Sequence, residues 1–278
     1  MLHTNTVATR TGAFHFNGEV AHVSSILDGK TVVVTGAASG IGRAIAIGAA
    51  RHGAKAVIVS DVEQTPKEGG EPATDAIEAI GGTARFHRAD VTSRSEVDDL
   101  VAAADEFGGV DVMVCNAGIT LADDGADVRE EDYRRLMAVN LDGVLFGAQA
   151  AARTMKTAGR QGSIVLMGSM GGVVGAGFTV AYSTSKGGVV LMAKALADAL
   201  GPDGIRVNSI CPGVIDTHLL RNTPAVASAA DGFRQRTPLR RMGQPSEIGD
   251  AVAWLGSDLS SFVTGIALLV DGGLTSVV

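Results

Sequence analysis

The stretch TGAASGIG, residues 35–42, follows a short apolar run and leads directly into a helical pattern of small apolar residues. Its three glycines allow a tight turn, a close approach of the backbone to a pyrophosphate, and close packing of the helix. The N-terminus of that helix offers unpaired amides to negative charge. A plain turn would explain the glycines but would not need this spacing. The order of strand, glycine loop and helix predicts a dinucleotide site, lined by Gly36, Ser39, Gly40, Ile41 and Gly42.

Outside this stretch, short apolar runs alternate with helical patterns from Lys30 onward. The runs predicted as strands are 31–34, 56–60, 84–87, 110–115, 163–167, 206–210 and 266–270. The predicted helices are 41–51, 74–80, 96–107, 130 to about 157, 181–200 and 246–255. Such alternation indicates parallel strands with right-handed helical crossovers. We therefore expect an α/β fold: a Rossmann-type, doubly wound parallel sheet of about seven strands with helices on both faces, in a single domain.

Composition narrows the possible partners. The chain has 278 residues, a formal net charge of −7 and no large cluster of Lys and Arg, which disfavours nucleic-acid binding. It has no apolar run of about eighteen residues, so we expect no membrane association and a cytoplasmic protein. Its two cysteines, Cys115 and Cys211, lie in apolar contexts without metal-ligand spacing. They are interpreted as buried thiols, and no metal site is expected.

Two segments fall outside the regular alternation. Residues 1–28 lack the apolar core of a signal peptide. This extension is most simply a flexible tail, with an arm that packs on a neighbouring subunit as the alternative, and 29–278 is then the catalytic domain. Residues 213–243 are irregular and contain or adjoin three prolines. Long irregular segments in compact domains are usually functional, so this one is predicted to be a lid on the substrate side, with an ordinary surface excursion as the alternative.

The second predicted strand ends in Asp61 and Val62. An acidic side chain at this point can accept hydrogen bonds from both hydroxyls of an adenosine ribose, and it repels a 2′-phosphate. Arg43 lies beyond the glycine loop and is expected to face into the helix, and no basic residue stands between Gly36 and Gly40. These features favour NAD over NADP. The alternative is that Asp61 caps the following turn.

Two further strand ends fit the same pocket. Asp90 and Val91 follow the third strand, where they could cover the adenine. Asn116, Ala117 and Gly118 follow the fourth, where small residues let the chain pass beside a cofactor. Polar or small residues at successive strand ends are what a cofactor crevice requires.

The stretch YSTSK, residues 182–186, places a tyrosine and a lysine on one helix face, one turn apart. Chance also produces this spacing. A lysine ammonium one helical turn away, together with the positive ring of a bound nicotinamide, favours the phenolate and should lower the pKa of the phenol, which prepares Tyr182 for acid/base chemistry.

Together these stretches resemble the short-chain dehydrogenase/reductase family, in its subdivision with TGxxxGxG and YxxxK. The resemblance runs from about Lys30 to the carboxyl end. It rests on TGAASGIG, on Asp90 with Val91, on NAG at 116–118, on Asn140 within AVNLDG, on Ser169, on YSTSK and on IRVNSICPGVIDT at 205–217. One departure is Cys115 in CNAG, where the family often has asparagine; we interpret it as a packing residue.

The resemblance implies roles for four catalytic residues. Tyr182 would be the general acid/base, and Lys186 would activate it and bind the nicotinamide ribose. Ser169 would polarise the substrate oxygen, and Asn140 would hold a water that connects Lys186 to solvent.

The resemblance also implies the nicotinamide site and the assembly. The residues that would line the nicotinamide are Pro212, Gly213, Ile215 and Thr217. The family usually forms a homotetramer or homodimer through long helices, here the segments near 130–157 and 181–200.

We therefore expect an NAD(H)-dependent oxidoreductase that interconverts a secondary alcohol and its ketone. The apolar segment 170–178, together with His218, Leu219 and Phe233 of the lid, favours an apolar or aryl substrate, including one with a small polar group. One alternative is a dehydrogenase of a sugar or other polyol. An epimerase or dehydratase, and a non-catalytic dinucleotide-binding sensor on the same fold, are others.

Overall fold

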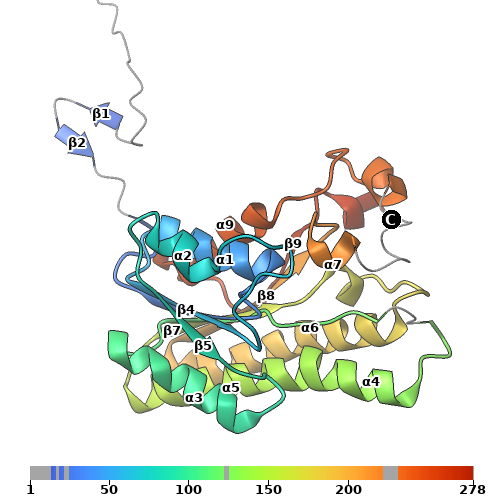
Figure 1. The fold of residues 1–278 in the computed structure, drawn as a ribbon, viewed down its shortest axis with the longest axis horizontal. Coiled ribbons are helices and arrows are strands. Elements are labelled where there is room, and N and C mark those ends of the chain that lie inside the picture. Colours follow the sequence, from blue (N-terminus) through green and yellow to red (C-terminus); the bar gives the residue numbers. More distant parts are fainter. Residues whose placement is uncertain (1–13, 17–18, 22–24, 122–124, 222–230, 278) are drawn as a thin grey trace, which may run out of the picture.

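Seven parallel strands form one sheet in the order β5-β4-β3-β6-β7-β8-β9 (Figure 1). The computed structural model describes residues 14–16, 19–21, 25–121, 125–221 and 231–277. The strands are β3 (Thr31–Thr35), β4 (Ala56–Asp61), β5 (Ala84–Arg88), β6 (Val112–Cys115), β7 (Gly162–Met167), β8 (Ile205–Pro212) and β9 (Ala267–Val270). The predicted fold class and the number of sheet strands are confirmed.

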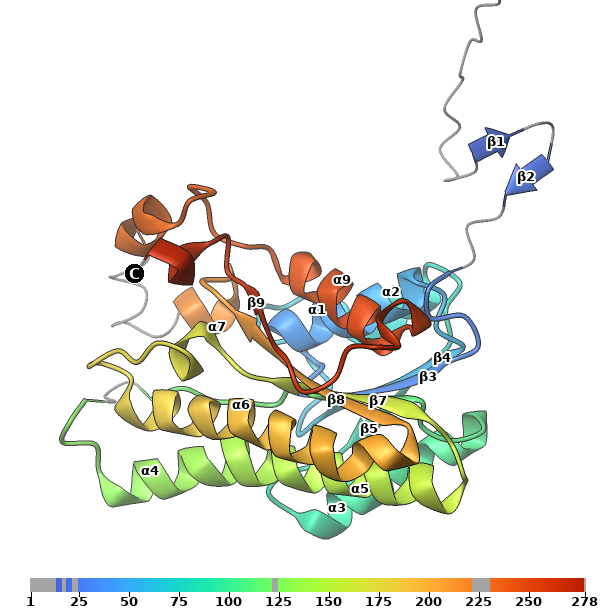
Figure 2. The same cartoon turned by 180° about the vertical axis from the view of Figure 1, so that it is seen from behind.

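Helices cover both faces of the sheet (Figures 1 and 2). On one face lie α1 (Gly40–Arg51), α2 (Ala73–Glu78) and α9 (Pro245–Gly256). On the other lie α3 (Arg94–Ala102), α4 (Glu130–Met137), α5 (Gly143–Thr157) and α6 (Val180–Leu200). Short 3-10 helices are Ala103–Phe107, Met170–Gly172, Gly201–Asp203, Asp258–Ser260 and Leu274–Val277.

The central strands β3, β4, β6 and β7 are largely apolar because both of their faces are buried, whereas the edge strand β5 carries Arg85, His87 and Arg88. Side chains of successive residues point to opposite faces of a sheet. Accordingly Val33 belongs to the core on the α3, α5 and α6 side, whereas Val32 and Val34 belong to the core under α1 and α9. All three are at most 1% exposed. Continuous apolar runs of this kind are typical of parallel sheets covered on both sides.

The strand order reverses beside β3, and this reversal places the site. The chain runs outward from β3 to β4 and β5, then returns to β6 on the other side of β3. The carboxyl ends of β3 and β6 therefore lie side by side, at the point where such sheets bind ligands. The Thr35 hydroxyl accepts hydrogen bonds from the backbone amides of Asn116, at 3.0 Å, and Ala117, at 3.1 Å.

Two predicted helices differ from the observed ones. The stretch expected as one helix over 96–107 is α3 followed by a 3-10 turn, and α3 begins earlier because Ser93 accepts a hydrogen bond from the amide of Glu96. The stretch from 130 to 157 contains a π-helical turn, Ala138–Asp142, between α4 and α5. A π turn carries one extra residue per turn and often marks a functional site.

The two irregular segments are described in part. In the extension, β1 (Phe14–Phe16) pairs antiparallel with β2 (Glu19–Ala21). The remaining residues up to 24 lie outside the described chain, as does the central part of the predicted lid, 222–230. The described lid residues include α7 (His218–Arg221) and a helix over 231–236.

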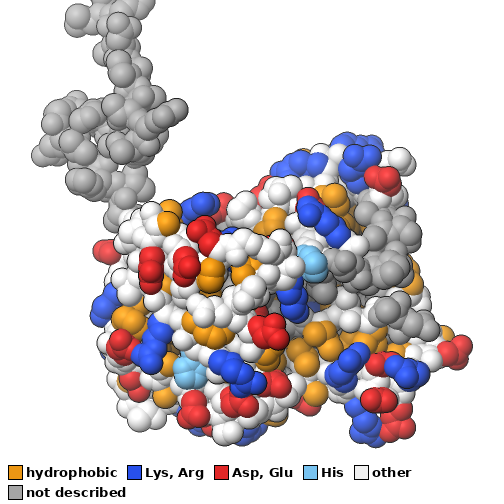
Figure 3. Space-filling model, viewed as in Figure 1, with side chains coloured by type: hydrophobic (Ala, Val, Ile, Leu, Met, Phe, Trp, Pro, Cys, Tyr) orange, Lys and Arg blue, Asp and Glu red, His pale blue; other side chains and the backbone are white. Residues whose placement is uncertain are grey.

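The surface carries charges of both signs. On the face shown in Figure 3, Lys and Arg side chains are interspersed with Asp and Glu. None of the helices in the described residues is long and apolar enough to span a bilayer.

Candidate active site

The glycine loop has the shape that a dinucleotide requires. Gly36 and Gly40 have positive φ values of 63° and 55°, which side-chain-bearing residues rarely adopt. A Cβ atom at Gly42 would overlap the carbonyl of Gly36, and one at Gly36 would lie 2.7 Å from the Cα of Ala117. At Gly36 and Gly42 the backbone of the loop therefore lies too close to its neighbours to leave room for a side chain. This cradle fits a pyrophosphate, which needs close contact with main-chain amides.

The first turn of α1 supplies those amides. Its N-cap is Ser39, and the amides of Ile41 and Gly42 have no hydrogen-bond acceptor among the described residues. The amide of Gly40 donates to the carboxylate of Glu68 at 2.9 Å. A negatively charged group is thus already bound at this helix N-terminus, as the helix dipole favours.

Asp61 lies at the carboxyl end of β4, beside the loop. One of its carboxylate oxygens accepts from the amide of Ala38 at 3.2 Å, and the other accepts from that of Val62 at 2.8 Å. Each oxygen can accept more than one hydrogen bond, so both remain able to bind a ribose hydroxyl. The Asp61 carboxylate thus both supports the local turn and faces the glycine loop.

Asp90 stabilises its own turn. Its carboxylate accepts from the amide of Thr92 at 2.9 Å and from the Thr92 hydroxyl at 2.8 Å. Val91 is 8% exposed and lies against Gly143 at the start of α5. Asp90 lies at a strand end, as predicted. Its observed hydrogen bonds, however, are those of a residue that caps its own turn.

Asn116 acts on the glycine loop from the neighbouring strand. Its side-chain amide donates to the carbonyl oxygens of Thr35, at 2.9 Å, and Gly36, at 3.1 Å. The Asn116 side chain therefore holds the glycine loop in place, and its Nδ2 atom already donates to two backbone carbonyls. Cys115 before it is buried against Gly147, and burial raises the pKa of its thiol to about 12. That environment agrees with a packing role for Cys115.

Three of the four predicted catalytic side chains meet near the end of β7. Ser169 follows β7 by two residues, and its hydroxyl accepts from the amide of Gly171 at 3.0 Å. Tyr182 and Lys186 lie one turn apart on α6, and Tyr182 is hydrogen-bonded to the Ser169 side chain. The ammonium of Lys186 donates to the carbonyl of Met167 at 2.8 Å and lies 5.7 Å from the centroid of the Tyr182 ring.

Asn140 lies within the π turn and is completely buried. Its side chain accepts from the amide of Ile119 at 2.8 Å and donates to the Ile119 carbonyl at 2.9 Å. It thereby ties the helix pair α4–α5 to the segment after β6. A Cβ atom at Gly118 would lie 3.4 Å from Asn140 Oδ1 and 3.5 Å from Lys186 Nζ, so Gly118 allows these two side chains to come close.

Burial changes the proton affinities of both α6 residues. It raises the pKa of Tyr182, and the hydrogen bond from Ser169 opposes this effect. It lowers the pKa of Lys186 to about 8. In the protein alone, the loss of solvation disfavours the charged form of each group. The expectation that Lys186 and the positively charged nicotinamide together lower the pKa of Tyr182 concerns the complex with cofactor and stays a prediction.

The residues expected around the nicotinamide lie at the end of β8. Pro212 is its last residue and is buried, and a Cβ atom at Gly213 would lie 2.6 Å from the Cα of Asp271. Ile215 is 6% exposed. The Thr217 methyl group lies 3.8 Å from the position of a Cβ atom at Gly40, so the segment predicted to be a lid begins beside the glycine loop.

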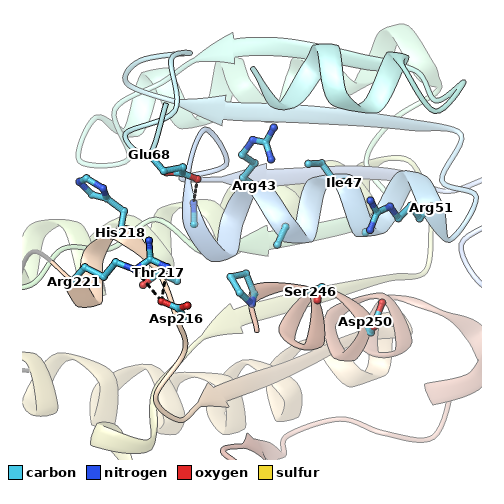
Figure 4. A pocket seen from close by; sticks show the side chains of 14 residues that line it. Arg43, Ile47, Arg51, Glu68, Asp216, Thr217, His218, Arg221, Ser246 and Asp250 are labelled. Carbon is cyan, nitrogen blue, oxygen red and sulfur yellow. Dashed lines mark hydrogen bonds and ion pairs between the residues drawn. The ribbon is translucent and has the colours of Figure 1, made fainter. Parts of the chain in front are cut away.

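A cavity of about 360 Å³ adjoins this point, between α1, α7 and α9. Figure 4 shows Arg43, Glu68 and Arg221 among its lining side chains. Arg43 lines this cavity, and its guanidinium donates to the carbonyl of Glu71 at 3.1 Å. This position differs from the expectation that Arg43 faces into the helix. Sequence reasoning also missed Glu68, which lies in an irregular loop without a motif. Within the described chain, no group of His, Cys, Asp and Glu residues is arranged to hold a metal ion.

Comparisons with known proteins agree with this geometry. Residues 36–275 match the model of a family described as enoyl-(acyl carrier protein) reductase. The chain is 40% identical over 250 residues to an L-rhamnose 1-dehydrogenase (NAD(P)(+)) of Azotobacter vinelandii, covering 90% of this chain and 98% of that protein. It is 41% identical over 252 residues to a cis-4-hydroxycyclohexanecarboxylate dehydrogenase of Sinomonas cyclohexanicum, covering 89% of this chain and 97% of the relative.

A solved structure extends the agreement to three dimensions. A short-chain type dehydrogenase/reductase from Mycobacterium marinum superposes with a TM-score of 0.84 at 36% identity, covering 91% of this chain and 98% of the other. The cradle, the strand-end residues and the Ser169, Tyr182 and Lys186 cluster occupy one edge of the same fold. The chain therefore belongs to the short-chain dehydrogenase/reductase family, and it is an oxidoreductase.

Proposed function

We propose that this protein is an NAD-dependent dehydrogenase that oxidises a hydroxyl group on a ring, with a sugar such as L-rhamnose as the first candidate substrate. The observation that carries the proposal is the cluster of Ser169, Tyr182 and Lys186 beside the glycine loop. The choice of a sugar is supported by the 40% identity to an L-rhamnose 1-dehydrogenase over nearly the whole of both chains. The sugar alternative from the sequence is thereby preferred to an aryl alcohol.

In this mechanism Tyr182 Oη accepts the proton of the substrate hydroxyl. The Ser169 hydroxyl donates a hydrogen bond to the same substrate oxygen and steadies the charge that develops on it. A nicotinamide held by the residues at the end of β8 would supply the hydride acceptor and, in its oxidised form, a positive charge. Lys186 holds a second positive charge one helical turn away, and both charges favour the phenolate against the effect of burial. Asn140 keeps the segment after β6 in place beside Lys186.

The expected nicotinamide dinucleotide cofactor is confirmed by family membership, and NAD is our proposed choice over NADP. It is supported by the Asp61 carboxylate beside the loop, which repels a 2′-phosphate. Asp61→Ala should raise the preference for NADP relative to NAD about tenfold, because removing roughly 1.4 kcal/mol of like-charge repulsion changes the ratio of dissociation constants by that factor. Dissociation constants of NADH and NADPH test this, and an unchanged ratio would count against the role of Asp61.

A second candidate is a more apolar ring alcohol, as the sequence favoured. Val173 and Phe178 precede α6 and are 46% and 40% exposed. Phe178 also contacts Phe233 of the lid, with ring centroids 6.4 Å apart. This apolar surface beside the catalytic helix, and the 41% identity to a cis-4-hydroxycyclohexanecarboxylate dehydrogenase, support an alicyclic substrate.

The experiment is a direct comparison of the candidates. The protein would be incubated with NAD and, separately, L-rhamnose, cis-4-hydroxycyclohexanecarboxylate and a simple secondary alcohol, while NADH absorbance is followed. We expect the highest kcat/KM with L-rhamnose. Higher kcat/KM with the alicyclic acid would favour the second candidate. If none of the compounds is oxidised although NADH binds, the non-catalytic sensor becomes the better interpretation.

We also propose that the protein is cytoplasmic and assembles as a homotetramer or homodimer through its long helices. Family resemblance supports the assembly, and exposed apolar side chains on α6 agree with it.

A further inference from the structure

The segment that follows β4 is bound back onto the glycine loop. Three hydrogen bonds join residues 67–71 to residues 39–43. The amide of Lys67 donates to the Ser39 hydroxyl at 2.7 Å, and the amide of Gly40 donates to Glu68 Oε1 at 2.9 Å. Arg43 donates to the Glu71 carbonyl at 3.1 Å. All three contacts involve the loop that is expected to cradle the cofactor, or the first turn of the helix behind it.

Glu68 resembles the cofactor in what it offers this loop. Like a phosphate oxygen, its carboxylate oxygen is a negatively charged hydrogen-bond acceptor. Gly40 is the first residue of α1, and its amide points out of the helix end with those of Ile41 and Gly42. Figure 4 shows the Glu68 side chain directed at this first turn. One amide cannot make a full hydrogen bond to Glu68 and to a pyrophosphate at the same time.

We propose that Glu68 is an internal competitor of the cofactor pyrophosphate, and that residues 67–71 form a gate which must move for the cofactor to bind. This inference rests on the proposed function. It makes Glu68 a residue that sets cofactor affinity, separate from Asp61, which is proposed to set the choice between NAD and NADP.

The gate is built to move as a short unit. Pro66 at its start is buried, whereas residues 67–71 are all exposed. Gly69 and Gly70 have positive φ values of 79° and 91°, and a Cβ atom at either would meet nothing within 4 Å. The gate therefore loses few contacts when it opens, apart from its three hydrogen bonds.

A displaced Glu68 has a partner nearby. Arg43 lines the same cavity as Glu68, and its Nε is buried without a hydrogen-bond partner among the described residues. Moving the Glu68 carboxylate from the helix end toward this guanidinium keeps it paired with positive charge.

The test compares two variants of the same loop, in each of which a glutamate is replaced by the uncharged glutamine. Glu68→Gln removes the charge from the α1 N-terminus, whereas Glu71→Gln removes an equal charge three residues away, where the contact to Arg43 is made by the backbone carbonyl. Dissociation constants of NADH and of ADP would be measured by titration calorimetry. ADP is included because it carries the diphosphate without the nicotinamide.

For Glu68→Gln we expect both ligands to bind about two- to fivefold more tightly, the effect of one anion at a helix N-terminus. Glu71→Gln should bind them like the wild type. Without ligand, Glu68→Gln should unfold at a slightly lower temperature, because α1 loses a favourable charge at its start.

Unchanged ligand affinity in Glu68→Gln, or equal tightening in both variants, would overturn the gate while leaving the proposed function intact. Failure of the wild type and both variants to bind NADH would instead contradict the proposed function, and this inference with it.

Discussion

Burial acts in opposite directions on Tyr182 and Lys186, the two side chains of α6 that are proposed to be catalytic. It raises the pKa of Tyr182 and lowers that of Lys186, so at neutral pH the phenol holds its proton more firmly and the ammonium holds its proton less firmly. The positive charge of a bound, oxidised nicotinamide is expected to reverse the first effect. Tyr182 would then become an effective base only when the cofactor is present.

Removing the Tyr182 hydroxyl should abolish turnover without affecting cofactor binding. In Tyr182→Phe we expect kcat to fall by about 10²- to 10⁴-fold, the usual contribution of a positioned acid/base group. The dissociation constant of NADH should change little, because the ring remains. Tyr133→Phe, on the exposed tyrosine of α4, is the matched control. A Tyr182→Phe variant with wild-type rates would refute the mechanism.

The lowered pKa of Lys186 should appear in the stability of the protein. The folded group has a pKa of about 8, while a lysine of the unfolded chain keeps about 10.4. Between these values the unfolded chain binds more protons at this lysine, so the contribution of Lys186 to the free energy of unfolding should rise with pH from about 8 to 10. The raised pKa values of Cys115 and Cys211 act in the opposite sense, so the effect is read as a difference from a variant without the lysine. The rise should reach roughly 2 kcal/mol, because a tenfold difference in proton affinity corresponds to about 1.4 kcal/mol. Tyr182 acts in the opposite sense only above about pH 10.

Urea unfolding of the wild type and of Lys186→Met, at about pH 7.5, 8.5 and 9.5, measures this effect. The wild type should gain stability relative to the variant as the pH rises. A constant difference between the two would show that Lys186 titrates normally in the folded protein.

At the scale of elements, α1 and α9 pack closely because both carry glycine at the contact. A Cβ atom at Gly48 would lie 3.6 Å from the Cα of Gly249. One at Gly249 would lie 2.9 Å from the carbonyl oxygen of Ala44, which is backbone and cannot move aside cheaply.

Gly249→Ala should therefore destabilise the protein by about 1 to 3 kcal/mol, as overpacking typically does. Gly201→Ala is the control, because its Cβ would meet nothing within 4 Å. Both would be measured by chemical denaturation. Equal free energies of unfolding of the two variants would mean that α1 and α9 can move apart to make room for the added methyl group without loss of stability.

Some of these structural features could be predicted from the sequence, and others could not. Most sheet strands were predictable because central parallel strands buried on both faces must be apolar. The proximity of Tyr182 and Lys186 was predictable because a spacing of four residues places them on one helix face. The π turn was not predictable, because its conformation accompanies contacts between Asn140 and Ile119, 21 residues apart in the chain. The same holds for Glu68, whose partner Gly40 lies 28 residues away. The direction of the Tyr182 pKa depends on burial, which spacing does not report.

At the scale of the molecule, α6 presents apolar side chains to solvent. Leu191 is 66% and Val180 39% exposed. They are eleven residues apart, about three turns, so they share one helix face. An exposed apolar stripe on a long helix is what a helix-mediated assembly would bury.

Leu191→Lys should therefore shift the protein to a smaller assembly, because it places a charge in the proposed contact. Sedimentation velocity would compare it with the wild type and with Ile80→Lys, a control on an exposed side chain after α2 that is 48% accessible. An unchanged sedimentation coefficient in Leu191→Lys would exclude this helix face from the interface.

The π turn between α4 and α5 has a consequence for how this chain can vary in length. A π turn holds one residue more than an α turn, so one extra residue can be accommodated there while the helices on either side keep their faces. Deleting Leu141 should therefore allow a continuous α-helix in which Leu136 of α4 and Ala148 of α5 both still face the core. Such a deletion would instead change the local backbone that holds the buried Asn140 side chain against Ile119. The extra residue thus serves the position of Asn140 and not the packing of the helix pair.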